Sequence, residues 1–513
     1  MALVAGVAYT PSLGHGFIYD DYWTVVGNRH LDQTLKQLLR AAASGRSVEW
    51  KMPDATRPAM GVSLWLDRQL FGLSAAGHHL HSVALYALVS VLVLLLAFAL
   101  FRSFAAALAA GLAFAVMPLH SEVVSAVNYR EDLLAALGIF AAAALCFWPA
   151  RGVDKWRPYA VAALWFYALA SKESALVAPL LVAALSLLRP LPRWTRQGSL
   201  GLAVAVVALL WLNWRFGLSV LGEQIPRADY SSWGERCLRT LRFELWSLAE
   251  SLLPLRARPE YDPLGAPSWS WILAALPLLA LPIALLRVER ARPLAALSCL
   301  ALLAPLLTSP LFAPTNELAD RYCFVGSLAA ALAVGWGIHW LARSHALVAL
   351  TLLAGMCVAG VLQCWSATSV WQSEVSLWTF AAQTAPRSPR SWSSLSRVHR
   401  MADQPELARR AIERALVLKP DFVPAQVACA LNELWEGDRA AARRVLSTVV
   451  PKSDLHREAL SVASRCAYLP TDAAAGECAR RAVPKGMVLG DPGALRAISE
   501  RLLAQGSESA AGQ

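Results

Sequence analysis

Long apolar runs fill the first 365 residues of the chain, and a polar, charged segment follows them. A helix that crosses a bilayer needs about 20 mostly apolar residues. The opening run lacks the basic start and the cleavage site of a signal peptide, so we count it as a first, short span that Pro11, Gly14 and Gly16 interrupt. The pattern predicts about eleven spans, at 2–19, 77–101, 104–119, 131–149, 158–171, 174–189, 198–216, 269–287, 293–311, 323–342 and 346–365.

The composition agrees with a chain that lies mostly in a bilayer. Hydrophobic residues make up 57% of the 513 residues and charged residues 16%, against about 25% charged in an average soluble domain. These values exclude a single soluble globular domain and a disordered chain. The net charge of +11 would favour a nucleic-acid partner in a soluble protein. Here many of the basic residues lie in short loops between the predicted spans, where they set the orientation in the membrane. We therefore expect no nucleic-acid partner.

The basic residues alternate between successive loops, as the positive-inside rule requires. With the N-terminus inside, five short inward loops contain eleven basic residues, whereas three short outward turns contain one each, Arg130, Lys172 and Arg321. Residues 20–76, with amphipathic stretches at 31–43 and 59–73, and residues 217–268 form long outward loops. We expect a multi-pass protein of a bacterial inner membrane with a periplasmic C-terminal domain. The inward residues are Arg102, Arg151, Lys155, Arg157, Arg189, Arg193, Arg196, Arg287, Arg290, Arg292 and Arg343.

Residues 366–513 form a predicted soluble domain with the spacing of tetratricopeptide repeats. Such repeats place small and large apolar residues at fixed positions over 34 residues and bind peptides on a concave face. The alternative is an ordinary helical hairpin. If the domain is extracytoplasmic, Cys466 and Cys478 are a candidate disulfide pair. The positions that match the repeat are Trp392, Leu395, Ser396, His399, Ala408, Ile412, Ala415 and Pro420, with a looser second copy 34 residues later.

Ionisable residues gather beside the predicted spans, all on the outward side. Charges that merely end a helix at the interface are the alternative explanation for any one of them. Their joint occurrence favours a site for an anionic, membrane-borne substrate, because charges near a span are costly. These residues are Asp20, Asp21, His120, Glu122, Arg130, Glu131, Asp132, Lys172, Glu173, Glu317, Asp320, Arg321 and Tyr322.

These motifs resemble the transmembrane and tetratricopeptide-repeat proteins, which are O-mannosyltransferase-like members of the GT-C glycosyltransferases. The resemblance rests on Tyr19-Asp20-Asp21, Arg57-Pro58, Pro118-x-His120-x-Glu122 through Arg130, Ser171-Lys172-Glu173 and Asp320-Arg321-Tyr322. Asp320 departs from the family, whose members often have Glu at that position. The resemblance implies an all-α fold with a GT-C membrane domain over 1–365 and a repeat domain over 366–513.

The resemblance also implies an activity and roles for the residues. A sugar would pass from a polyprenyl-phosphate donor to a hydroxyl of an extracytoplasmic acceptor, a protein or a glycan, with mannose as the family's sugar. Asp20 or Asp21 would be the general base. Asp20, Asp21 and Glu122 are a candidate set of ligands for a divalent ion, although no strong metal signature is present. Arg321, Arg130 and Lys172 would hold the donor phosphate, and His120, Glu122, Glu173, Tyr322 and Arg57 would orient the substrate.

Three other functions remain open at this point. A ligase or polymerase of lipid-linked glycans would use Arg and His residues of a late outward loop, but residues 217–268 contain no His. A non-catalytic membrane scaffold would recruit partners through its repeats. A transporter would show paired broken helices in matching halves, and the predicted spans do not.

Overall fold

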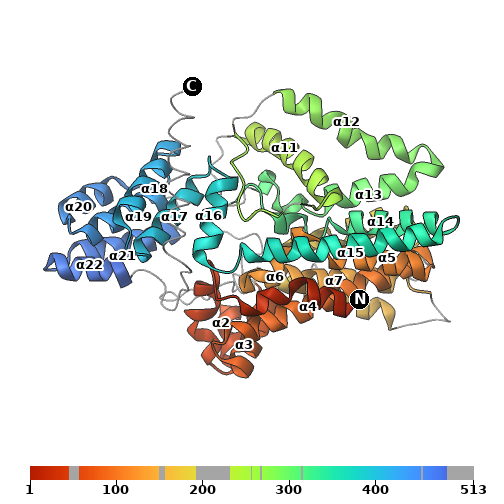
Figure 1. The fold of residues 1–513 in the computed structure, drawn as a ribbon, viewed down its shortest axis with the longest axis horizontal. Coiled ribbons are helices and arrows are strands. Elements are labelled where there is room, and N and C mark those ends of the chain that lie inside the picture. Colours follow the sequence, from red (N-terminus) through yellow and green to blue (C-terminus); the bar gives the residue numbers. More distant parts are fainter. Residues whose placement is uncertain are drawn as a thin grey trace.

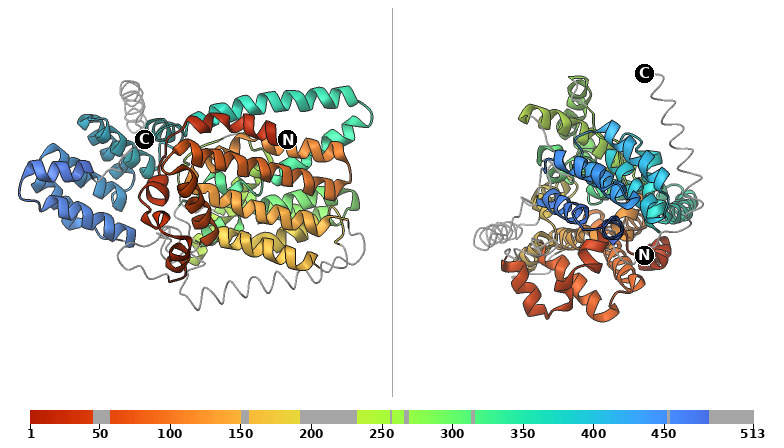
Figure 2. Two further views of the ribbon diagram at one scale, coloured as in Figure 1. Left: turned by 90° about the horizontal axis from the view of Figure 1, so that it is seen from below. Right: turned by 90° about the vertical axis from the view of Figure 1, so that its left-hand side faces the viewer.

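The fold consists of an apolar helix bundle with a smaller helical domain beyond one end (Figures 1 and 2). The computed structural model describes residues 1–44, 57–149, 156–191, 232–255, 257–265, 269–312, 316–451 and 454–481. Within these ranges every regular element is helical, so the predicted all-α class is confirmed. The bundle and its loops contain α1 (Ala2–Tyr9), α2 (Leu35–Ser44), α3 (Pro58–Phe71), α4 (Ala75–Phe101), α5 (Phe104–Ala115), α6 (Ser121–Ser125), α7 (Arg130–Phe147), α8 (Arg157–Ser171), α9 (Ala178–Leu185), α11 (Trp233–Leu252), α12 (Trp269–Leu286), α13 (Arg292–Leu303), α14 (Leu328–Ala342) and α15 (Ala346–Ser369).

Among the described residues, three helical segments are long and apolar enough to cross a membrane. They are α4, the segment Glu289–Thr308 that contains α13, and α15. A fourth results if α5 and the segment Pro118–Ser125, which bend by 52°, count as one span. Most other predicted spans coincide with helices that are shorter or carry charges, and the predicted span 198–216 lies outside the described residues. These helices support a membrane protein, while the count of about eleven spans stays a prediction.

Helix α15 presents an apolar surface that the other described residues leave open. Only 17% of its most apolar window is buried, and Leu347, Leu350 and Val358 are 76%, 63% and 63% exposed. A contiguous apolar face of this kind is expected where lipid hydrocarbon, rather than water, surrounds a helix. The face of α15 therefore agrees with a position at the edge of a bundle in a bilayer.

Small residues let the central helices approach closely. Helix α5 packs against α4 and α14, and α7 packs against α4 and α8. On α7, a Cβ atom added at Gly138 would lie 2.6 Å from the carbonyl oxygen of Leu164 on α8. Close backbone contacts at small residues are typical of helix packing in membranes.

Three arginines from the predicted inward loops meet at one end of the bundle. Arg102 donates to the carbonyl of Phe147 at 2.9 Å, and Arg157 to the carbonyl of Trp148 at 3.0 Å. Arg189 donates to the carbonyl of Leu100 at 3.4 Å. These bonds satisfy carbonyl groups at helix C-termini. The charge alternation in the sequence thus corresponds to two physically distinct ends of the bundle.

The C-terminal helices repeat at a fixed interval. Helices α17 and α19 begin at Pro389 and Val423, and α18 and α20 begin at Pro405 and Arg439, so each pair is separated by 34 residues. The disulfide between Cys466 and Cys478 is present. The interval matches the period read from the sequence, and the tetratricopeptide assignment stays a prediction. The helices are α16 (Glu374–Thr384), α17 (Pro389–Met401), α18 (Pro405–Leu418), α19 (Val423–Glu436), α20 (Arg439–Thr448), α21 (Asp454–Ala467) and α22 (Asp472–Arg481).

Candidate active site

The two neighbouring aspartates after the first apolar helix have different surroundings. The Asp21 side chain is fully buried, and its two oxygens accept the main-chain N–H groups of Asn128 at 2.7 Å and Ile18 at 3.2 Å. Burial raises the pKa of Asp21 to about 7. Asp20 is only partly buried. Asp21 therefore ties the turn to the segment before α7, and Asp20 is the member of the pair with access to a substrate.

Arg321 forms the centre of the candidate site. It lies in the short helix η10 (Asp320–Cys323), and its guanidinium group forms an ion pair with Glu122. The Arg321 main-chain N–H donates to the same carboxylate at 2.9 Å. The guanidinium carbon lies 4.3 Å from the ring centre of Tyr129 and 5.0 Å from that of Tyr322. Glu122 and two aromatic rings thus fix the orientation of this cation.

Asp20 belongs to the same cluster. It interacts electrostatically with Tyr19 and Tyr129, and Arg321 interacts with both of these rings as well. The structure therefore brings together Asp20, Arg321, Glu122 and Tyr322, which the sequence separates by up to 302 residues.

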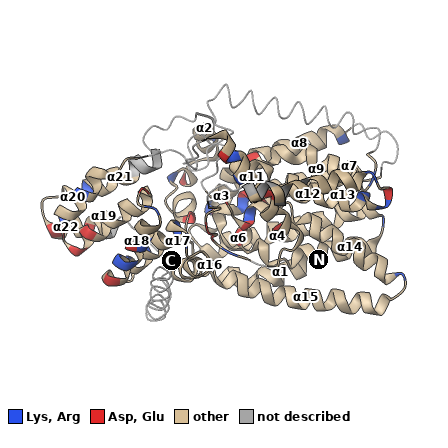
Figure 3. Ribbon diagram, turned by 90° about the horizontal axis from the view of Figure 1, so that it is seen from above, with Lys and Arg blue, Asp and Glu red and all other residues tan. Residues whose placement is uncertain are grey.

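A second group of predicted site residues interacts electrostatically with Arg321. The Lys172 ammonium group lies 2.6 Å from a carboxylate oxygen of Asp132 and 3.1 Å from one of Glu131. Arg57 binds Glu173 through two N–H groups, at 3.0 and 2.7 Å, and also pairs with Glu131. Arg321 interacts electrostatically with Lys172 and Asp132, so both groups form one network. Figure 3 shows charged residues gathered near this end of the bundle, with mostly uncharged helices beyond it.

Arg130 lies apart from this network. Its side chain is completely buried and bonds to Asp67 at 2.5 Å, to Ser82 at 3.1 Å and to the carbonyl of His78 at 2.7 Å. Asp67 balances the positive charge of Arg130, and the Ser82 hydroxyl and the His78 carbonyl accept its other N–H groups. This placement favours a structural role for Arg130 over the expected contact with phosphate.

His120 is also a core residue. Its two ring nitrogens lie 2.8 Å from the Tyr86 hydroxyl and 2.8 Å from the Ser327 hydroxyl. The side chain is fully buried, and its ring lies 4.7 Å from the ring centre of Phe324. His120 therefore links α4 to the start of α14, which favours a structural role over the expected orientation of substrate.

The carboxylates considered as metal ligands have other partners. Both oxygens of Asp21 accept main-chain N–H groups, and Glu122 accepts two bonds from Arg321. In the described part of the chain, no group of three or more His, Cys, Asp or Glu side chains is arranged to hold a metal ion. Asp20, Asp21 and Glu122 in this arrangement do not fit a ligand set for a divalent ion.

Three residues of the site come from segments that the sequence analysis did not single out. Arg390 of α17 donates to a carboxylate oxygen of Glu260 at 2.9 Å and to the Tyr19 hydroxyl at 2.5 Å. Glu374 of α16 accepts the main-chain N–H of Tyr19 at 2.5 Å. Hydropathy singles out charges beside apolar runs and gives no sign of a carboxylate inside a long loop. For Arg390 the sequence offers one sign, its position two residues before Trp392 of the repeat pattern.

The clustered charges do not form a positive pocket. In the described part of the chain, Arg57, Lys172, Arg321 and Arg390 contribute four positive charges, and at least six carboxylates interact with them. A phosphate bound here would have to compete with these carboxylates, above all with Glu122 for Arg321. The carboxylates are Asp20, Glu122, Glu131, Asp132, Glu173 and Glu260.

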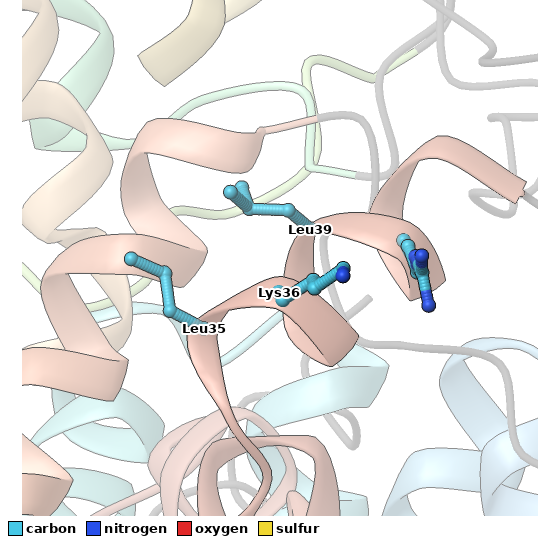
Figure 4. A pocket seen from close by; sticks show the side chains of 4 residues that line it. Leu35, Lys36 and Leu39 are labelled. Atoms are coloured by element: carbon cyan, nitrogen blue, oxygen red, sulfur yellow. The ribbon is translucent and has the colours of Figure 1, made fainter.

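A shallow depression on α2 lies away from these residues. Leu35, Lys36, Leu39 and Arg40 line it, and Figure 4 labels the first three on this helix. Leu38 of the same helix is 1% exposed and packs with Leu64 of α3 in an apolar cluster. The two amphipathic stretches expected in the first outward loop are therefore helices that pack beside the bundle, and the depression contains none of the site residues.

Sections of the chain are similar to proteins named protein O-mannosyl-transferases. One match, to Tmtc1 of Drosophila melanogaster, is 35% identical over 133 residues, which are 25% of this chain and 16% of that protein. A match to TMTC3 of Homo sapiens is 31% identical over 170 residues, 31% of this chain and 18% of that protein. A third, F38B6.6 of Caenorhabditis elegans, is 29% identical over 145 residues, 27% of this chain and 21% of that protein.

The matched sections thus span about a fifth or less of each of these relatives. No family model matches the chain, and no solved structure matches it. The similarity supports a relationship to membrane glycosyltransferases that act on proteins.

Proposed function

We propose that this protein is a membrane glycosyltransferase of the GT-C type. It moves a sugar from a polyprenyl-phosphate donor to a hydroxyl of an extracytoplasmic protein, at Ser or Thr. The observation that carries the proposal is the Arg321 guanidinium, which pairs with Glu122 and lies on the ring of Tyr129 at the end of an apolar bundle. Asp20 interacts electrostatically with the same ring. A fixed cation and a carboxylate near one ring suit a lipid donor whose phosphate stays near the membrane surface. The names of the similar proteins agree with this chemistry.

The reaction replaces one bond at the anomeric carbon of the sugar by another. The bond to the phosphate oxygen breaks, a bond to the acceptor oxygen forms, and the polyprenyl phosphate leaves. The acceptor's proton passes to the Asp20 carboxylate, which acts as general base. Because Asp is a weak base for an alcohol, positioning and stabilisation of the leaving phosphate must supply most of the rate.

Arg321 is the proposed ligand of the departing phosphate. A guanidinium group offers two parallel N–H donors to phosphate oxygens. Glu122 and the rings of Tyr129 and Tyr322 hold that group in place before the donor arrives. Lys172 adjoins Arg321 and contributes positive charge, while Glu131 and Asp132 hold its ammonium group.

The proposed orientation places the site and the repeat domain outside the cytoplasm. Disulfides persist in oxidising compartments such as the periplasm, and the Cys466–Cys478 pair lies in the repeat domain. The three arginines at the opposite end of the bundle agree with a cytoplasmic face there. We propose a bacterial inner membrane, with the repeat helices binding the acceptor protein.

The experiment is transfer of labelled mannose from polyprenyl-phosphate mannose to Ser/Thr-containing peptides, with the full chain in lipid vesicles. Arg321→Gln removes the cation, and we expect transfer to fall by about 100-fold or more, the scale of one lost charge-stabilising group. The matched control is Arg292→Gln, because Arg292 lies at the start of α13 with a side chain 51% exposed. Normal transfer by Arg321→Gln, or an equal loss in both variants, would contradict the proposed role.

A further inference from the structure

Tyr19, the residue before Asp20, has a backbone conformation that aromatic residues rarely adopt. Its φ angle is 48°, in the left-handed region. A bulky side chain is disfavoured there, and such a residue persists only where its surroundings hold it. The turn that presents Asp20 therefore depends on contacts from other parts of the molecule.

Those contacts come from the repeat domain, at sequence distances of more than 350 residues. The Glu374 carboxylate accepts the Tyr19 main-chain N–H at 2.5 Å, and Arg390 donates to the Tyr19 hydroxyl at 2.5 Å. The Tyr19 ring meets that of Trp378 edge to face, with ring centres 5.5 Å apart. Both ends of Tyr19, backbone and hydroxyl, are thus held by α16 and α17.

Arg390 connects Tyr19 to a second loop of the bundle domain. Its other N–H group binds Glu260 at 2.9 Å, and the hydroxyl of Ser388 donates to the same carboxylate at 3.1 Å. The main-chain N–H of Arg387 donates to Asp262 at 2.7 Å. The start of α17 therefore joins the loop that contains Glu260 to the turn that contains Asp20.

The junction also has a shared apolar core. Ile18, Ala126 and Tyr129 of the bundle domain pack in one cluster with Trp371 and Trp378 of the repeat domain. Tyr129 is the ring on which Arg321 lies. The repeat domain is therefore built into the walls of the candidate site, and Figure 2 shows its helices directly beyond that end of the bundle.

We propose that the repeat domain completes the active site, with Arg390 and Glu374 as positioning residues that hold the Tyr19–Asp20 turn. This inference rests on the proposed function, because it assigns Asp20 the role of base. Arg390 acts through Tyr19 and Glu260 and needs no contact with substrate. A repeat domain that served only to recruit acceptors would contact the bundle without setting the geometry of this turn.

The test combines hydrogen exchange with kinetics on the full chain in nanodiscs. Arg390→Ala removes the bonds to Tyr19 and Glu260. Arg390→Lys keeps the positive charge but loses the planar guanidinium group that donates to two partners. Tyr19→Phe removes only the hydroxyl. Arg410→Ala is the matched control, because Arg410 is an exposed arginine of the repeat domain. The readouts are amide exchange over residues 17–26, and kcat and KM for transfer from polyprenyl-phosphate mannose.

We expect Arg390→Ala to speed exchange over residues 17–26 by about tenfold or more, and to lower kcat by about 10- to 100-fold. KM for the donor changes little, Arg390→Lys is intermediate, and Tyr19→Phe has no added effect in the Arg390→Ala background. Arg410→Ala matches the wild type. Unchanged exchange and kcat in Arg390→Ala would overturn the inference.

The exchange result is independent of any activity. If Arg390→Ala speeds exchange but the wild-type protein transfers no sugar, the proposed function fails, while Arg390 still holds the Tyr19–Asp20 turn. If transfer is normal in both Arg390→Ala and the wild type, the contacts of Arg390 have no role in the reaction. The inference then fails, while the proposed function stands.

Discussion

At the scale of single residues, neighbouring groups of the same type have different roles. Asp20 and Asp21 are adjacent, yet Asp21 bonds to the main chain, whereas Asp20 is partly exposed and interacts electrostatically with Tyr129. Arg130 is completely buried and bonds to Asp67, whereas Arg321 is partly exposed and lies on the ring of Tyr129, with which Asp20 also interacts. The sequence singles out the charged residues that lie beside apolar runs, because such charges are rare, but not Glu260, Glu374 or Arg390. It does not predict their division into roles, because that depends on contacts between segments more than 100 residues apart.

Asp21 gives a pH-dependent prediction. Burial raises its pKa to about 7 in the folded protein, against about 3.9 in an unfolded chain. The folded state therefore binds the proton more tightly, and the contribution of Asp21 to the free energy of unfolding decreases as the pH rises from about 4 to about 7. Asp21→Asn cannot titrate. Thermal unfolding of both proteins in detergent should show the wild type losing stability relative to the variant between about pH 5 and about pH 8.

The expected relative loss over that pH range is at least about 1.4 kcal/mol, the equivalent of one pKa unit. A stability difference that stays constant from pH 5 to pH 8, or moves in favour of the wild type as the pH rises, would mean that the Asp21 carboxyl is ionised throughout.

At the scale of helices, the apolar pattern predicts positions well and lengths less well. The predicted spans 77–101, 158–171 and 346–365 coincide with α4, α8 and α15 within a few residues. The predicted span 104–119 ends in a 52° bend after Ala115, where Pro118 follows. Hydropathy measures apolar character and not the direction of the chain, so a bend inside an apolar run leaves no signal in it.

The packing of α14 against α5 gives a prediction at this scale. A Cβ atom at Gly335 would lie 2.5 Å from the carbonyl oxygen of Ala106 and 2.8 Å from the Cβ of Ala110. Gly335→Ala should therefore push the helices apart and cost about 1–3 kcal/mol. Gly337→Ala on the same helix is the control, because no atom lies within 4 Å of its added Cβ. Thermal unfolding in detergent measures both, and equal stabilities would refute this packing.

At the scale of the whole molecule, the two ends of the bundle differ in their charged residues. Arg102, Arg157 and Arg189 bond to carbonyls at one end, and the network around Arg321 lies at the other. The repeat domain lies beyond one end of the bundle (Figure 2). The sequence predicts this separation from the alternation of basic loops. The contacts of Glu260 and Arg390 are missing from that prediction, because 130 residues separate the two and neither lies beside an apolar run.

Sidedness can be tested without any assay of activity. A topology reporter fused after residue 513 should report the extracytoplasmic side, and one inserted after Arg343, in a predicted inward loop, should report the cytoplasm. Alkylation of non-reduced protein from cells should leave Cys466 and Cys478 unmodified, because they form a disulfide. A cytoplasmic signal from the C-terminal fusion would remove the proposed site from the side where its acceptor lies.

The central claim is that Asp20 is the base of a sugar-transfer reaction, and one pair of variants tests it. Asp20→Asn is compared with Asp32→Asn, which makes the same change in the same outward loop at a side chain 62% exposed. The assay is transfer of labelled mannose from polyprenyl-phosphate mannose to acceptor peptides by the full chain in vesicles. We predict that Asp20→Asn inserts normally and transfers at least about 100-fold more slowly, while Asp32→Asn matches the wild type. Transfer by Asp20→Asn at the wild-type rate would contradict the account.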